Sequence, residues 1–226
     1  MPKNLAPDEL TDSQSSRAQF LKVAGGTGAA GALAIFVAAC GGSSKKSSSG
    51  SSSSPPKKKT TSADTKSDIA IVNYALTLEH LEAAFYKQAI ESGEVKTPAV
   101  VEAAKVIYQD EQEHVAALMA TVKQLGGTPA AAPKTKFDAV IKGGEKMILT
   151  TAAAVENLGA SAYLGQAGKI KNKDILAAAL SIHTVEARHA AVLNTVIGKS
   201  IVPDGAFAKP ADMATVLKTV KPFIAA

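Results

Sequence analysis

The sequence has few of the residues on which a disulfide-stabilised or aromatic-rich fold depends. It contains one cysteine among 226 residues, so no internal disulfide can form. Tryptophan is absent, and aromatic residues make up only 4% of the chain. Hydrophobic residues nevertheless account for 46%, with alanine dominant, which suits closely packed helices better than a β-sandwich. The composition therefore favours an all-α fold.

The positive charge of the chain is concentrated in one segment. The formal net charge is +5, but residues 69–226 contain 16 Lys or Arg and 15 Asp or Glu. Residues 40–68 contain six Lys and two Asp. A short basic segment of this kind favours contact with an anionic membrane surface. Nothing resembles a DNA-reading motif, so we expect no nucleic-acid partner.

Residues 1–39 have the pattern of an export signal. Residues 16–22 resemble a twin-arginine signal, except that Ala18 stands in place of the second arginine. A mild apolar stretch follows and ends in Val-Ala-Ala-Cys-Gly, which resembles the bacterial lipobox with Cys40 as the lipidated thiol. The alternative is an uncleaved single-pass anchor. We predict a protein that is exported and anchored by lipid to the outer face of the cytoplasmic membrane.

Residues 40–66 are rich in Ser, Lys and Pro and have no apolar periodicity. Such a segment cannot bury a core, so we predict a disordered tether between the anchor and the rest of the protein.

Two copies of one pattern lie about 75 residues apart beyond the tether. In each copy a Glu is followed by a Tyr seven residues later and by a Glu-x-x-His motif 30 or 32 residues later. The two copies are Glu79, Tyr86, Glu111, His114 and Glu156, Tyr163, Glu186, His189. Residues three apart are neighbours on a helix surface, so each motif presents a carboxylate and an imidazole on one face. One such motif is common by chance, but two with a matching Glu are not.

The four Glu residues of this pattern fall inside apolar stripes. The stripes alternate steps of three and four residues, the spacing of a helix face that packs against a bundle core. Buried carboxylates must be paired or must bind metal. Two divalent cations would neutralise four carboxylates, and two imidazoles would complete the coordination. The predicted metal ligands are Glu79, Glu111, His114, Glu156, Glu186 and His189.

This ligand set resembles that of the ferritin-like superfamily of di-iron and di-manganese four-helix bundles. That fold takes one Glu from each of two helices and a Glu-x-x-His from each of the other two. Residues 78–86 and 125–129 are similar to bacterial ferritin-like lipoproteins related to plant desiccation-induced proteins. The resemblance covers about residues 67–198 and implies an antiparallel four-helix bundle with a crossover connection between helices 2 and 3.

Capping residues and glycines predict the helix limits. We expect a first helix from Ser67–Asp68 to Gly93 and a second from Thr97 to Gly126. A third helix, interrupted by a glycine pair at 143–144, should end near Gly168, and a fourth should run from 172 to 198. The Pro- and Ala-rich residues 126–144 would form the crossover. Residues 199–226 form a C-terminal extension with a possible short helix over 210–221.

Several residues near the ligands have more than one interpretation. Tyr86 and Tyr163 could donate hydrogen bonds to the opposite carboxylates or be ordinary core aromatics. Glu82 could be an extra ligand, a carboxylate that lines the metal entry, or a surface residue. Asp110 could accept a hydrogen bond from an imidazole across helices.

The leading functional hypothesis is a di-iron, or di-manganese, oxidoreductase that oxidises Fe(II) with oxygen or peroxide. The first alternative is a non-catalytic module that sequesters metal or protects against stress and desiccation. The second is a structural bundle whose groove binds a partner. A lipid anchor and a long tether disfavour a closed ferritin cage, so we expect a monomer or dimer.

Overall fold

The computed structural model describes residues 61–225, and these are almost entirely helical. The elements are α3 (Ser62–Ser92), α4 (Pro98–Gln124), α5 (Asp138–Lys142), α6 (Gly144–Ala167), α7 (Lys173–Val196), α8 (Met213–Val220) and the 3-10 helix η2 (Lys221–Phe223). Over these residues, the single β-type pairing is an isolated bridge between Thr135 and Ile224. The predicted all-α class is confirmed. The export signal, Cys40 and nearly all of the predicted tether lie outside the described residues, and those hypotheses stay predictions.

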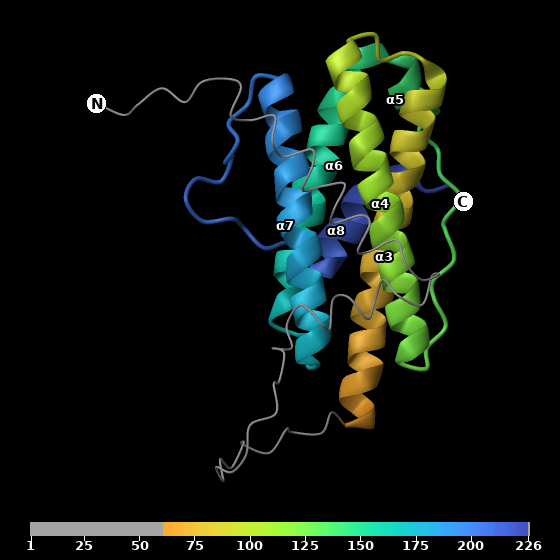
Figure 1. Ribbon diagram of the computed structural model, residues 1–226, viewed down its shortest axis with the longest axis vertical. Coiled ribbons are helices and arrows are strands. Elements are labelled where there is room, and N and C mark those ends of the chain that lie inside the picture. The colour runs from red at the N-terminus through yellow and green to blue at the C-terminus, as the bar shows by residue number, and fades with distance from the viewer. Residues whose placement is uncertain (1–60, 226) are drawn as a thin grey trace, which may run out of the picture. The chain divides into compact units, whose positions relative to one another are not determined.

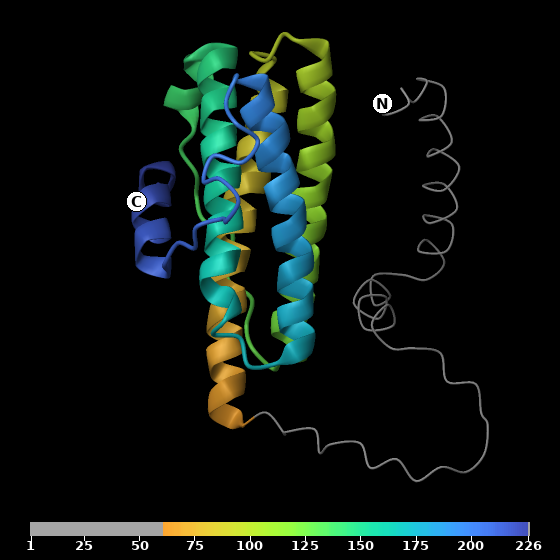
Figure 2. The same ribbon diagram turned by 90° about the vertical axis from the view of Figure 1, so that its left-hand side faces the viewer.

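Four long helices form the bundle (Figures 1 and 2). Helices α3 and α4 make one antiparallel hairpin and α6 and α7 make the other, while α3 also packs against α6 and α4 against α7. Helices α4 and α6 run in the same direction, so the chain must return along the bundle between them. Residues 125–137 make this connection, as Figure 1 shows in green. The fold therefore has the predicted crossover between the second and third long helices.

The first long helix begins earlier than predicted. Helix α3 starts at residue 62, within the segment predicted as tether, and Thr61 is its N-cap. The Thr61 hydroxyl accepts a hydrogen bond from the Asp64 backbone N–H, and the Asp64 carboxylate accepts one from the Thr61 backbone N–H. This reciprocal capping box satisfies two of the free N–H groups at the helix start. The predicted start of the helix was wrong because Thr61 and Asp64 were assigned to the tether and their capping box was not recognised.

Asp68 has a different role from the predicted N-cap of the first helix. Its side chain is buried, with 1% exposure. Its carboxylate accepts hydrogen bonds from the backbone N–H groups of Lys171 and Asn172, each at 2.9 Å. Asn172 is the N-cap of α7. Asp68 therefore ties α3 to the α6–α7 turn and fixes where the second Glu-x-x-His helix begins.

The start of α4 is held by a residue from another helix. Pro98 occupies the first turn, but the Thr97 side chain makes no capping bond to its own helix. Its hydroxyl instead donates to the Glu145 carboxylate. The same carboxylate accepts from the backbone N–H groups of Lys96 at 2.7 Å and Thr97 at 3.2 Å. Glu145, in the first turn of α6, thus caps α4 across the bundle.

The C-terminal extension packs on the outside of the bundle beside α6 (Figure 2). The predicted short helix is present as α8. A side chain at Gly165 would place Cβ 1.9 Å from the Ala211 carbonyl oxygen, so glycine permits this close approach. Backbone hydrogen bonds join Lys136 to Phe223 and Ala225 to Lys134, so the chain end holds the crossover in place. None of the helices that residues 61–225 form is long and apolar enough to cross a membrane.

Candidate metal centre

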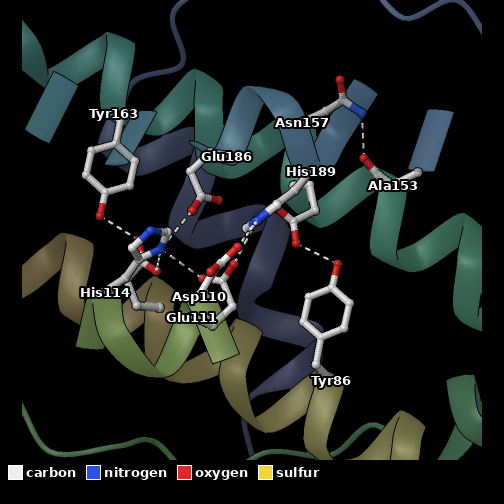
Figure 3. A network of polar contacts seen from close by, with 11 residues as sticks. Tyr86, Asp110, Glu111, His114, Ala153, Asn157, Tyr163, Glu186 and His189 are labelled. Carbon is white, nitrogen blue, oxygen red and sulfur yellow. Dashed lines mark hydrogen bonds and ion pairs between the residues drawn. The ribbon is translucent and has the colours of Figure 1, made fainter. Parts of the chain in front are cut away.

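The four stripe carboxylates converge in the middle of the bundle. Glu79 comes from α3, Glu111 from α4, Glu156 from α6 and Glu186 from α7. All four have 0% exposure, and the two motif histidines have 9% and 7%. Figure 3 shows the histidines facing these carboxylates from α4 and α7. The structure therefore brings all six predicted ligands into one buried cluster.

The six residues form two overlapping groups, and this sharing is the central feature of the site. The first group is Glu79, Glu111, His114 and Glu186, and the second is Glu111, Glu156, Glu186 and His189. Within each group, one ligand atom per residue lies within 4.8 Å of the others. Glu111 and Glu186 belong to both groups. Each group contains residues from both helical hairpins, so neither hairpin holds a complete group.

The histidines approach the carboxylates through Nδ1. His114 Nδ1 lies 3.1 Å from Glu79 Oε2, 3.3 Å from Glu111 Oε2 and 3.1 Å from Glu186 Oε1. His189 Nδ1 lies 3.1 Å from Glu111 Oε1 and 3.3 Å from Glu156 Oε2. Metal–ligand bonds are about 2.0–2.2 Å, so two ligands at right angles on one ion are about 3 Å apart. The observed spacings fit this geometry.

Several ligand atoms lack a hydrogen-bond partner among the described residues. These atoms are Glu111 Oε1, Glu156 Oε2, both carboxylate oxygens of Glu186, and His189 Nδ1. They lie close to one another but without hydrogen-bond geometry. Unpaired buried polar atoms are costly, and their convergence is what a bound cation would satisfy. The donor set of carboxylates and imidazoles fits iron or manganese.

Burial and crowding of acids shift the pKa values in the site. Burial, with repulsion from Glu79, raises the pKa of Glu111 to about 8. Burial and repulsion from Glu79 likewise raise the pKa of Glu186 well above its usual value. Burial alone would lower the pKa of His189, but the hydrogen bond with Asp110 and the nearby Glu111 carboxylate raise it to about 12. Without metal, protons therefore supply the positive charge that the cluster requires.

Two tyrosines bind carboxylates across the bundle, in the arrangement considered from the sequence. Tyr86 of α3 donates to Glu156 Oε1, and Tyr163 of α6 donates to Glu79 Oε1 (Figure 3). Each bond occupies Oε1 and leaves Oε2 next to a histidine. The tyrosines therefore orient each unshared Glu so that one oxygen faces the cluster. Each tyrosine therefore donates its hydrogen bond to the Glu of the other repeat.

Asp110 contacts the second histidine from outside the cluster. Its Oδ2 lies 3.1 Å from His189 Nε2 and comes from α4, across the helix interface from α7. With Nε2–H donated to Asp110, the Nδ1 atom of His189 is free to act as a ligand. The sequence indicated Asp110 as such an acceptor across helices.

Glu82 is the residue that sequence reasoning placed least well. The surface interpretation is wrong, because the side chain has 2% exposure. A Cβ atom at Gly159 would lie 2.9 Å from both Glu82 Oε1 and Glu186 Oε2, so this glycine makes room for two carboxylates. Burial and repulsion from Glu186 raise the pKa of Glu82 well above its usual value. Gly159 within an apolar stripe was the signal in the sequence for this fifth buried Glu.

A ferritin-like domain model matches residues 67–199, which is more than half of the chain and includes all six clustered residues. The chain belongs to the ferritin-like family. No curated protein matched the chain. Family membership agrees with the four-helix bundle, the crossover and the buried Glu and His cluster, which can bind metal ions.

Proposed function

We propose that this ferritin-like protein binds two iron or manganese ions and oxidises Fe(II) with oxygen or peroxide. The observation that supports the proposal is the pair of overlapping groups that share Glu111 and Glu186. A carboxylate common to two groups would be shared by two ions if both were bound. Glu79 and His114 would complete one ion's coordination, and Glu156 and His189 the other's.

The chemistry of the reaction balances with two ions. Each Fe(II) loses one electron, and O2 accepts two electrons and two protons and leaves as hydrogen peroxide. The chain contributes position and charge. Tyr86 and Tyr163 hold Oε1 of the unshared carboxylates, and Asp110 holds the His189 ring, so ligand atoms are oriented before metal arrives. Burial of the cluster excludes bulk water from it.

The test combines metal analysis with oxygen consumption. Protein purified aerobically should contain two iron or manganese ions per chain, and Fe(II) added to metal-free protein should consume oxygen. Glu111→Gln should remove both the metal and the oxygen uptake, because Glu111 belongs to both groups. Glu113→Gln is the matched control, since Glu113 is exposed on the same turn of α4. Equal metal content and oxygen uptake in the two variants would refute the proposal.

Deep burial also favours a second candidate, a metal-sequestering or stress-protective module without turnover. The four carboxylates have no exposed surface, so bound ions would be shielded from solvent. Protein that binds two ions but consumes no oxygen or peroxide with Fe(II) would support this function and exclude the oxidase.

We also propose that the protein is exported and tethered to the outer face of the cytoplasmic membrane through lipid on Cys40. The lipobox-like sequence around this cysteine supports the proposal. Cys40→Ser should release the protein from the membrane fraction or block signal removal. Processed Cys40→Ser protein that stays in the membrane at high salt would contradict it, since salt removes attraction by the tether lysines.

A further inference from the structure

Beside the metal centre, the bundle contains a small, partly open apolar cavity. It has a volume of about 30 Å³ and lies between all four long helices. Its lining includes Ala75, Leu118, Ala162 and Ile175, and its walls are almost entirely apolar. The ring of Tyr163 also lines it, and the hydroxyl of this residue donates to Glu79. Tyr163 therefore stands between the cavity and the first group of ligands.

The two repeats differ at the position before the tyrosine, and the smaller residue lines the cavity. Ala162 precedes Tyr163 in the second repeat, whereas Phe85 precedes Tyr86 in the first. Phe85 has 1% exposure and packs against Phe137 with ring centroids 5.1 Å apart. Ala162 is equally buried but has only a methyl group. The first repeat thus has an aromatic side chain at this position. The second repeat has only a methyl group there, and the cavity lies beside that methyl group.

The size and chemistry of this space select its occupant. An apolar cavity of roughly 150 Å³ stays dry and accepts benzene, so a cavity five times smaller admits only a molecule of very few atoms. Its half-buried lining residues lie toward solvent and are Thr121, Ile170, Ala178 and Ala179. Tyr74 Oη and Gln166 Nε2 on the lining have no hydrogen-bond partner in residues 61–225, so a water molecule is the competing occupant.

We propose that this cavity binds dioxygen and is its route to the metal centre. The inference rests on the proposed function, because oxygen is useful here only if the centre reacts with it. Dioxygen is small and apolar, so it partitions into a dry apolar space that offers water few partners. Hydrogen peroxide is polar, and Tyr74 Oη and Gln166 Nε2 are the two unpaired polar atoms on walls that are otherwise almost entirely apolar. The cavity thus favours dioxygen over peroxide as the oxidant of this protein.

The direct test is to measure NMR relaxation of methyl groups in metal-free protein with and without dissolved oxygen. Dissolved oxygen is paramagnetic and speeds the NMR relaxation of nearby methyl groups. The methyl groups of Ala75 and Ala162 should relax faster under oxygen than those of Ala89 and Ala153, which are as buried but do not line the cavity. Equal enhancement in both pairs, or an ordered water that fills the cavity, would overturn the proposal. This measurement needs no metal, so it stands even if the proposed function fails.

Variants then connect the cavity to turnover. Ala179→Val narrows the cavity, and Ala104→Val is its matched control, since each Ala is half-buried and seven residues before the Glu of its motif. Ala179→Val should remove the excess relaxation and slow Fe(II) oxidation by oxygen several-fold. It should leave Mn(II) binding and oxidation by peroxide unchanged. An unchanged oxygen dependence in Ala179→Val would exclude the route, whereas absence of oxidation in wild type would refute the proposed function instead.

Discussion

The sharing of two carboxylates predicts that the six ligands are not equivalent on mutation. Glu111→Gln removes a charge from both groups, whereas Glu79→Gln removes one from the first group only. Wild type should bind two Mn(II) ions, Glu79→Gln should bind one, and Glu111→Gln should bind neither tightly. Glu156→Gln should behave like Glu79→Gln, because it belongs only to the second group.

The expected magnitude follows from mass action. An ion present at a hundred times its Kd stabilises the folded state by about 2.7 kcal/mol, so two ions contribute about 5.4 kcal/mol. For a domain of this size, 1 kcal/mol moves Tm by about 2–4 °C. Mn(II) should therefore raise the Tm of wild type by about 11–22 °C and that of Glu79→Gln by about half as much. The Tm of Glu111→Gln should hardly move.

The assay is a pair of melting curves for each variant, with and without Mn(II), together with metal content after gel filtration. Each shift is measured against the variant's own metal-free state, so changes in intrinsic stability cancel. If Glu79→Gln and Glu111→Gln lose the same number of ions, the two carboxylates are not shared, and the assignment of two overlapping groups is wrong.

Three further predictions concern stability and metal binding. Asp68→Ala should lower the free energy of unfolding by about 2–4 kcal/mol, because two backbone N–H groups lose a charged acceptor. Chemical denaturation measures this change. As a control, Asp174→Ala, at an exposed residue, should lower the free energy of unfolding by less than half as much. The metal-free protein should be less stable at pH 9 than at pH 6. Glu111, with a pKa of about 8, loses a stabilising proton over this range, and His189, with a pKa of about 12, keeps a proton that the unfolded chain releases. A Tm that increases over this range would contradict this prediction. Gly159→Ala should displace the two adjacent carboxylates and weaken Mn(II) binding in a titration, and an unchanged affinity would show that the site can relax around the new methyl group.

The sequence predicted the bundle and its cluster because both depend on local periodicity. Each ligand lies on an apolar stripe, and a helix places residues three and four apart on one face. Helix α3 began too late in the prediction, although its capping box at Thr61 is also local and could have been recognised. The start of α7 at Asn172 was predicted, but the role of Asp68 in holding it depends on contacts with a distant part of the chain.

Other features of the site depend on how the hairpins pack. The sharing of Glu111 and Glu186 is a property of four helices together, so no single stripe indicates it. The sequence left a surface position open for Glu82, because its burial depends on the missing side chain at Gly159 on another helix. The cap that Glu145 provides for α4 likewise replaces a local one that Thr97 was expected to supply.

The exchange of tyrosines between the two hairpins has a consequence for how such a chain could arise. Each hairpin supplies a Glu-x-x-His motif and the tyrosine that holds the other hairpin's Glu. A gene that encoded one hairpin would have supplied three residues of one metal group and one residue of the other, and two copies related by a twofold axis would have completed both. Duplication and fusion of that gene would preserve the site at once, provided the linker could run the length of the bundle. Once fused, the copies were free to diverge, and Phe85 and Ala162 mark where the two ends no longer match.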